Sequence, residues 1–505
     1  MPRDYRVVEG AKLGGSFDIG NDRSVLGELS LLGSETSLYL HDPKFIHIQD
    51  DGARCIHGVL HDRTKVTVLG SSVLTSLGSA TRNDGCFHYA ELMPAYVVSG
   101  GHHLSADVAE ITKVIMHVDD AEDIFHDPDA MGHAIDPQAL IGQLVAANEE
   151  FIGRTIPTGP SPEIAYFTGR IELADVATTI GRVRVFHRPE SSHPLSTREV
   201  GMRNRTLVEI SFPEPRLLDN ALDAVMGLLR FLAILAGRPP NLAGIWLETV
   251  RGDAGMPLDL YWTHPPDRPA KWEERRPHPL EILIHVVEEP GRFATVLSNW
   301  LAADAGRIEA RLRFASGFEQ QRSFSIERLI GAANMFDILP DDAFRAVEPL
   351  DMDVLQARTR ARTEFRALPE SPGRNSVLDA LGRLGRPTLR SKVLDRATLV
   401  SRALKEPLLD LELVTDEAVR CRNYFVHGTA GGFSYAENGD IVTFFTSALE
   451  FLFAASDLID AGWDIAAWRG RGSVLAHPFN RVLHGWDVHA TRIRKLRLER
   501  KDRTS

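Results

Sequence analysis

Residues 419–428, with the sequence VRCRNYFVHG, bring together side chains that could act on a phosphodiester. Arg422 is a permanent cation whose planar guanidinium fits the oxygens of a phosphate. His427 can accept or donate a proton near neutral pH. RNA carries its own nucleophile, the ribose 2′-hydroxyl beside the scissile phosphate. A group that moves protons and a group that stabilises charge therefore suffice for metal-free cleavage of RNA.

The end of a helix must position these two side chains. Residues 416–426 have helical spacing, and Gly428 ends the pattern. Positions i and i+5 lie roughly 140° apart around an ideal helix, so we expect that one straight helix does not aim both groups at one point. Either the last turn unwinds at Gly428, or a second copy of the chain faces the first across a two-fold axis. The second arrangement would create a composite site with two arginines and two histidines.

The spacing between Arg422 and His427 is weak support by itself, because it recurs in the chain. Arg182 and His187 share it, and we assign them to the surface and turn of a sheet, since a strand-like pattern surrounds them. Residues 422–427 differ in their context, which includes an adjacent asparagine, an apolar Tyr-Phe-Val filling and a following glycine. This context makes them the candidate site.

Composition limits the class of protein. The chain has 505 residues, of which 43% are apolar and 25% charged, as in ordinary globular proteins of several domains. It has no long uninterrupted apolar run and no secretion signal at the start, so we expect a cytoplasmic protein that makes no membrane contact. Its three cysteines are too few and too scattered for a disulfide framework or a zinc site. We expect no metal and no cofactor.

The charge is uneven along the chain. A net charge of −12 argues against a generic nucleic-acid coat. Residues 492–503 nevertheless carry seven basic residues against two acidic ones. We predict that this tail contacts a phosphate backbone, with an affinity that falls steeply with salt; the alternative is a solvated terminal helix. The candidate RNA-binding residues in the tail are Arg492, Arg494, Lys495 and Arg497.

The N-terminal part of the chain has short, strand-like runs bounded by glycine, aspartate or proline. We also expect helices at 137–153 and 217–236 and a turn at 83–85. These features predict a β-rich region at residues 1–290, in one piece or as two modules at about 1–155 and 160–290. The expected strands are 24–33, 37–40, 45–48, 65–69, 108–118, 165–173, 179–187 and 205–212.

From about residue 290 the pattern changes to amphipathic helices, which we take as a domain boundary. A short hairpin at 433–445, turning through Asn438 and Gly439, is the expected exception. We therefore predict an α+β protein in which an all-α helical bundle at 291–470 follows the β-rich region and precedes a tail at 471–505. The expected helices are 293–311, 326–339, 350–368, 377–384, 389–404, 416–426 and 447–461.

Residues 422–427, RNYFVH, resemble the arginine-polar-x3-histidine signature of HEPN domains, a helical superfamily that includes many metal-independent ribonucleases. A β-rich region followed by such a domain is similar to the ApeA family of bacterial anti-phage proteins. The similarity also covers GELSLLG at 27–33, IHGVL at 56–60 and the stretch 293–300. The resemblance implies a HEPN domain at 291–470 and an N-terminal region that senses a cue or regulates the nuclease.

The resemblance also implies roles for individual side chains. Arg422 would bind and stabilise the phosphate, and His427 would be the general base or acid. Asn423 would orient the arginine or the phosphate. Arg420 and Tyr424 are further candidates for contact with RNA. Where the family often has an acidic residue in its first HEPN helix, this chain has Asn334, so a helper role at this position stays open.

The resulting hypothesis is a homodimeric, metal-independent endoribonuclease of anti-phage abortive infection. It would cut tRNA or other single-stranded loops to a 2′,3′-cyclic phosphate and a 5′-hydroxyl, and an unknown phage-derived trigger would release it. HEPN-mediated dimers, or a higher oligomer, are the expected assembly. Two alternatives stay open: a catalytically silent HEPN module that binds RNA or protein, and an N-terminal region that binds a sugar or nucleotide. In the silent module Arg422 would cap a helix and His427 would pack at a dimer seam.

Overall fold

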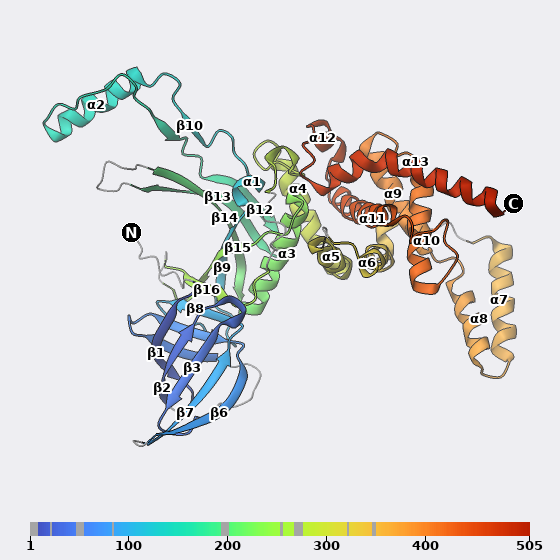
Figure 1. The fold of residues 1–505 in the computed structure, drawn as a ribbon, viewed down its shortest axis with the longest axis horizontal. Helices are drawn as coiled ribbons and strands as arrows, with labels where there is room; N and C mark the ends of the chain where they lie inside the picture. The colour runs from blue at the N-terminus through green and yellow to red at the C-terminus, as the bar shows by residue number, and fades with distance from the viewer. Residues whose placement is uncertain are drawn as a thin grey trace. The chain divides into compact units, whose positions relative to one another are not determined.

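The computed structural model describes residues 9–20, 23–46, 55–82, 85–192, 201–252, 256–266, 276–320, 323–345 and 350–504. The chain forms two compact units, residues 1–301 and 302–505. The described part of the first unit is rich in strands, and that of the second contains helices alone (Figure 1). The predicted α+β class is confirmed.

The first unit is built on a single antiparallel β-sheet. Its strands come from both of the expected N-terminal modules. The order is β12-β13-β14-β9-β15-β16-β8-β5-β4-β1-β2-β3-β7-β6. The strands are β1 (Lys12–Asp18), β2 (Ser24–Ser30), β3 (Ser37–Asp42), β4 (Cys55–Leu60), β5 (Lys65–Leu69), β6 (Ser72–Arg82), β7 (Gly85–Met93), β8 (Tyr96–Gly100), β9 (Ile111–Val118), β12 (Glu172–Thr178), β13 (Gly181–Ser192), β14 (Gly201–Arg216), β15 (Leu242–Thr249) and β16 (Leu258–Trp262).

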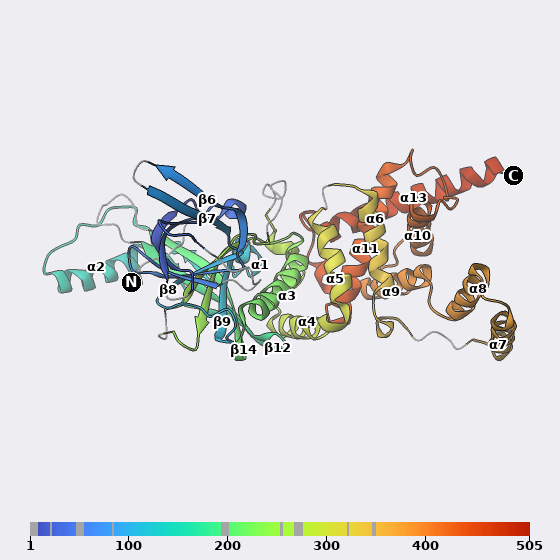
Figure 2. The same ribbon diagram turned by 90° about the horizontal axis from the view of Figure 1, so that it is seen from below.

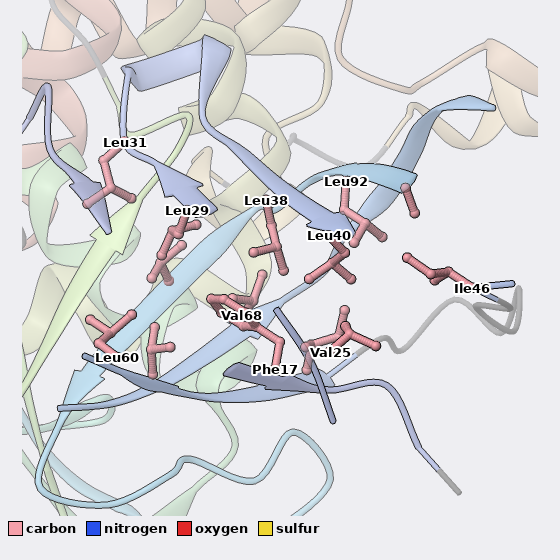
Figure 3. Packing of buried hydrophobic residues seen from close by; sticks show 14 residues of the cluster. Phe17, Val25, Leu29, Leu31, Leu38, Leu40, Ile46, Leu60, Val68 and Leu92 are labelled. Carbon is pink, nitrogen blue, oxygen red and sulfur yellow. The ribbon is translucent and has the colours of Figure 1, made fainter. Parts of the chain in front are cut away.

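Strands β1 to β5, β7 and β8 enclose an apolar core around Phe17 (Figure 3). Alternate residues point inward, as the strand period requires. Two glycines make room for the Phe17 ring: a Cβ on Gly58 would lie 2.5 Å from its Cδ1 atom, and one on Gly27 would lie 2.9 Å from its Cδ2 atom. Both glycines belong to the runs that resemble the family, so those runs serve the packing of this core.

Helix α3 (Leu218–Ala236) packs against β9 and β14 on the other part of the sheet (Figure 1). It is buried along most of its length and ends at Gly237, whose φ of 72° is left-handed. Helix α4 (Pro290–Ala302) joins it, because the Trp300 ring lies 5.5 Å from that of Phe231. The observed division of the chain therefore follows α4, whereas the change of pattern in the sequence precedes it.

Further elements of this unit are the short helix α1 (Ala121–Ile124), the strand pair β10 (Met131–His133) and β11 (Ala165–Phe167), and α2 (Gln138–Ile152). The expected single strand at 165–173 is wrong, because Gly169 adopts a φ of 84° and separates β11 from β12. His187 is also not a surface residue, since it is 4% exposed. Residues five apart on a strand point to opposite faces, so Arg182 is exposed while His187 is buried.

Helices α5, α6, α9, α10 and α13 pack around α11 (Gly439–Asp460), whereas α7 and α8 lie apart from it (Figure 2). Because 89% of its apolar window is buried inside the protein, α11 is the core helix of this bundle, although its length and composition alone would suit a membrane span. The other helices are α5 (Asp304–Glu319), α6 (Ile326–Asp337), α7 (Met352–Ala367), α8 (Pro372–Arg383), α9 (Leu389–Leu404), α10 (Leu411–His427), α12 (Ile465–Gly470) and α13 (Pro478–Thr504).

Two expectations for this unit were wrong, and a third helix is confirmed but begins earlier than predicted. The helix expected at 293–311 is interrupted at Ala303, between α4 and α5. The hairpin expected at 433–445 does not form, because Asn438 occupies the N-cap position of α11 and Gly439 begins that helix. The helix expected at 447–461 is therefore one part of the longer α11. Of the remaining expectations, the turn at 83–85 and the strand at 45–48 lie largely outside the described residues.

Candidate active site

The candidate side chains lie at the C-terminal end of α10. This helix buries the face that includes Val414, Ala418 and Cys421 and leaves its last turn exposed. It runs without interruption to His427, where Gly428 takes the left-handed C-cap conformation with a φ of 66°. The Gly428 N–H donates to the Tyr424 carbonyl at 3.0 Å. The last turn is therefore wound to its end.

Arg422 and His427 meet within a single chain. The Nη1 atom of Arg422 lies 3.3 Å from Nε2 of His427. The expectation that one helix could not bring the groups together was wrong, because it considered only the directions of the Cα–Cβ bonds. The long side chain of Arg422 extends along the helix surface and so reaches His427, despite the angle between the two positions around the helix axis. Neither unwinding nor a second chain is needed for this contact.

Two amides hold the guanidinium of Arg422 in place. Nη1 donates to the side-chain oxygen of Asn423 at 3.0 Å. Nη2 donates to the side-chain oxygen of Asn334, on α6, at 2.9 Å. Helices α6 and α10 pack against each other, so the bundle itself presents Asn334 to the arginine. The departure from an acidic residue at this position thus still leaves a direct partner for Arg422.

These partners leave the charge of Arg422 uncompensated. Asn334, Asn423 and His427 are neutral acceptors, and no carboxylate among the described residues forms an ion pair with Arg422. Its Nε atom is buried and has no hydrogen-bond partner in the described part of the chain. A guanidinium whose charge no carboxylate compensates is suited to an anionic ligand.

Nε2 is the ring nitrogen of His427 that faces Arg422. A guanidinium only donates hydrogen bonds, so it can donate to Nε2 when the imidazole is neutral and carries its proton on Nδ1. His427 is exposed, as are the neighbouring Tyr424 and Val426, which are 41% and 40% exposed. An accessible imidazole is suited to proton transfer with a bound substrate.

Tyr424 belongs to a group of aromatic rings beside these residues. Its ring centroid lies 5.1 Å from that of Phe425 and 5.4 Å from that of Tyr435, both edge-on. Phe433 in turn packs on Tyr435 at 5.0 Å. The buried rings hold Tyr424 in position while part of its surface stays open to solvent.

The other predicted RNA-binding residues have acidic partners. Arg420 pairs with Asp416 at 2.9 Å. The tail residues form the C-terminal part of α13, and their cations are paired in the same way. Arg492 pairs with Asp440, Arg494 with Asp410, Arg497 with Glu417 at 2.7 Å, and Lys495 with Glu499 at 3.9 Å. The structure thus brings Arg422, Asn423 and His427 together and ties the tail to acidic groups.

Glu417 and Cys421 lie on the buried side of α10. Burial raises the pKa of the Glu417 carboxyl, while Arg497 and Arg420 act against the rise. Burial also raises the pKa of the Cys421 thiol to about 12, so this thiol is not a nucleophile at neutral pH. Tyr435 donates a hydrogen bond to Glu417 at 3.3 Å. Glu417 thus joins α10 to α13 through Arg497 and to the loop that follows α10 through Tyr435.

No group of three or more histidine, cysteine or acidic side chains in the described residues could hold a metal ion. Sequence reasoning named Asn334 but could not assign it a partner, since Arg422 lies 88 positions away along the chain. The contact between α6 and α10 was needed to connect them.

The fold and this site together define a class of protein: a β-rich N-terminal unit followed by a helical HEPN domain. Residues 13–300 match the family model described as ApeA N-terminal domain 1, and residues 330–466 match the model described as Apea-like HEPN. The chain belongs to the ApeA family, which at family level comprises HEPN-type nucleases of anti-phage defence. Comparisons with curated proteins and with solved structures gave no match.

Proposed function

We propose that this protein is a metal-independent endoribonuclease whose active site contains Arg422, His427 and Asn423. The observation that carries the proposal is the uncompensated guanidinium of Arg422 in contact with an accessible imidazole. The guanidinium supplies the positive charge that a metal ion supplies in other nucleases. HEPN domains commonly act on RNA, which contains the nucleophile that such a site needs.

The proposed reaction is an internal transesterification. When the phosphate takes the Nη1 donor of Arg422, Nε2 of His427 is released from that contact and accepts the proton of the ribose 2′-hydroxyl while the 2′-oxygen attacks phosphorus. Arg422 donates hydrogen bonds to the non-bridging oxygens, whose negative charge grows in the transition state. The bond from phosphorus to the 5′-oxygen breaks, and a protonated imidazole gives that oxygen a proton. The products are a 2′,3′-cyclic phosphate and a 5′-hydroxyl.

A homodimer would supply the second imidazole. One His427 cannot be unprotonated base and protonated acid at the same time, whereas two copies across a two-fold axis provide both forms. HEPN domains commonly dimerise, and the partly exposed apolar surface of Tyr424 and Val426 in the last turn of α10 is available for such a contact. In this proposal the bases on either side of the cut are unstacked, as in tRNA loops and other single strands.

Restraint by the N-terminal unit completes the proposal. Unchecked cleavage of cellular RNA would stop growth, so the nuclease must be inactive until infection. We assign this restraint, and the recognition of a phage-derived trigger, to residues 13–300, which match the ApeA N-terminal domain.

The test compares the full chain with Arg422→Ala and His427→Ala in cleavage of total tRNA and unstructured RNA in EDTA. The cleavage rate of both variants is expected to fall at least a hundredfold. This is the lower end of the range of rate losses that follow removal of a proton-transfer group. Arg182→Ala is the matched control, because Arg182 has the same spacing to a histidine but lies exposed on β13. Cleavage at the wild-type rate by both site variants would overturn the proposal. Tight RNA binding by a wild-type chain that never cuts would favour the silent binding module instead.

A further inference from the structure

Helices α7 and α8 form a hairpin, residues 351–386, that packs only weakly on the rest of its unit (Figures 1 and 2). No side chain of the hairpin is buried. Its half-buried apolar residues, such as Leu355, Phe365 and Leu381, lie where the two helices meet. An isolated pair of short helices is marginally stable in water, so a partner is expected on the exposed faces.

The chemistry of those faces is unusual for this chain. The hairpin contains seven arginines against five carboxylates, and no lysine, in a protein whose net charge is −12. Four of the arginines, at positions 358, 360, 362 and 366, lie on α7 with Glu364 as the single acid among them. Arginine suits phosphate contacts because of its planar fork of donors.

None of the hairpin arginines has an acidic partner among the residues that the structure describes. Arg358 and Arg374 donate to backbone carbonyls, of Leu384 and Phe365 respectively. Arg360, Arg362 and Arg366 form no side-chain hydrogen bond or ion pair with any described residue, and Nε of Arg362 is buried without a partner. In α13, by contrast, the predicted RNA-binding cations are paired with carboxylates. Cations without a carboxylate keep their full attraction for a polyanion.

The hairpin is also connected to the elements that build the site. It leaves the bundle after α6, which carries Asn334, and returns at α9. Helices α6 and α9 both pack against α10, which carries Arg422. The hairpin therefore lies, along the chain, between two helices that contact the helix of the site.

We propose that the α7–α8 hairpin is an RNA-binding arm, in which Arg360, Arg362 and Arg366 bind the phosphate backbone of the substrate. This inference rests on the proposed ribonuclease function and adds to it a binding surface outside the cleavage site. Arginines favour RNA over a protein partner here, because RNA presents a phosphate at every nucleotide and the planar fork of an arginine fits a phosphate. The arm holds the strand, and the α10 site cuts it.

The test measures binding of a labelled unstructured RNA to the full chain carrying His427→Ala, which prevents cleavage. In that background Arg360→Gln, Arg362→Gln and Arg366→Gln are combined. Each lost phosphate contact lowers the slope of log affinity against log salt by about 0.7 for a single strand. The triple variant is therefore expected to show a slope about 2 lower and at least a tenfold weaker affinity at low salt. The corresponding Arg→Lys triple is expected to keep most of the binding, because it keeps the charge.

The matched control combines Arg313→Gln, Arg402→Gln and Lys405→Gln, which removes the same charge from exposed positions on α5 and at the end of α9. Equal binding by the hairpin triple and this control would overturn the inference. A hairpin triple that binds RNA normally but dissociates from dimer to monomer would also overturn it, in favour of contact between copies. Cleavage by the unsubstituted chain is measured separately, so a failure of the nuclease proposal is distinguishable from a failure of the arm.

Discussion

The side-chain oxygen of Asn334 on α6 lies 2.9 Å from Nη2 of Arg422 on α10. An amide at this position fixes the guanidinium without cancelling its charge. A carboxylate would fix it equally well but would also compensate the charge that a phosphate requires. Asn334 is thus a positioning residue whose neutrality is part of the proposed chemistry.

Substitution at Asn334 tests this relationship. Asn334→Asp is expected to reduce RNA cleavage about tenfold, equivalent to about 1.4 kcal/mol, by pairing Arg422 with a carboxylate. The loss should appear in KM as well as kcat and should diminish as the pH falls and the new carboxyl is protonated. Asn334→Ala removes the hydrogen bond at all pH values and serves as the comparison. Identical pH profiles for the two variants would contradict the charge argument.

Gly428 is expected to tolerate alanine poorly. Its φ of 66° costs an L-residue about 1 kcal/mol or more, so Gly428→Ala should lower the free energy of unfolding by about that amount and disturb the adjacent His427. Gly439→Ala is the control, because Gly439 lies at the start of α11 and a Cβ there meets nothing within 4 Å. Thermal unfolding and RNA cleavage measure the two effects, and Gly428→Asn should be less harmful than alanine.

Tyr424 is expected to stack on a base beside the cut. Stacking on an aromatic side chain contributes about 1–3 kcal/mol per base, so Tyr424→Ala should raise KM by about fivefold to a hundredfold. Tyr424→Phe keeps the ring and should behave as the wild type. Leu312→Ala is the control, because this residue is similarly exposed, at 49%, and lies on α5. A phenylalanine variant as weak as the alanine variant would show that the hydroxyl, not the ring, matters.

Asp457 makes the stability of the helical bundle depend on pH in the acid range. Burial by itself would raise the pKa of this carboxyl, but Arg311 and Arg307 outweigh burial and hold the pKa below its ordinary value. A depressed pKa adds stability that is present above the unfolded pKa of about 3.9 and is lost as pH falls through the folded pKa.

Asp457→Asn removes this contribution. It leaves Arg311, which is 2% exposed, without its buried partner, and should cost about 3–5 kcal/mol of unfolding free energy at neutral pH. The free energy of unfolding should also depend less steeply on pH in the acid range. Glu309→Gln, an exposed acid on α5, is expected to change neither quantity. Denaturant unfolding at a series of pH values measures both.

Much of the architecture could be predicted from local patterns. The helix at 389–404 was predicted with the bounds of α9, and the glycine after His427 was recognised as a helix end. Gly27 and Gly58 could be recognised as members of runs that resemble the family. Their structural role, to leave room for the Phe17 ring, could not be predicted, because Phe17 lies on another strand. The Asn438–Gly439 pair was misread because the same dipeptide suits a hairpin turn and a helix start, and only packing of α11 in the core decides between them.

The sequence by itself determined the α+β class, the resemblance to the HEPN signature, and the choice of Arg422 and His427 as the candidate pair. Only the tertiary structure decided which cationic side chains are available to bind a phosphate. The tail arginines looked free because their carboxylate partners, such as Asp410, Asp440 and Glu417, lie tens of residues away along the chain. The same packing brought Asn334 to Arg422 and left the α7 arginines without a carboxylate partner among the described residues. Charges interact through space, and the spatial distance between residues far apart in sequence is set only when helices pack.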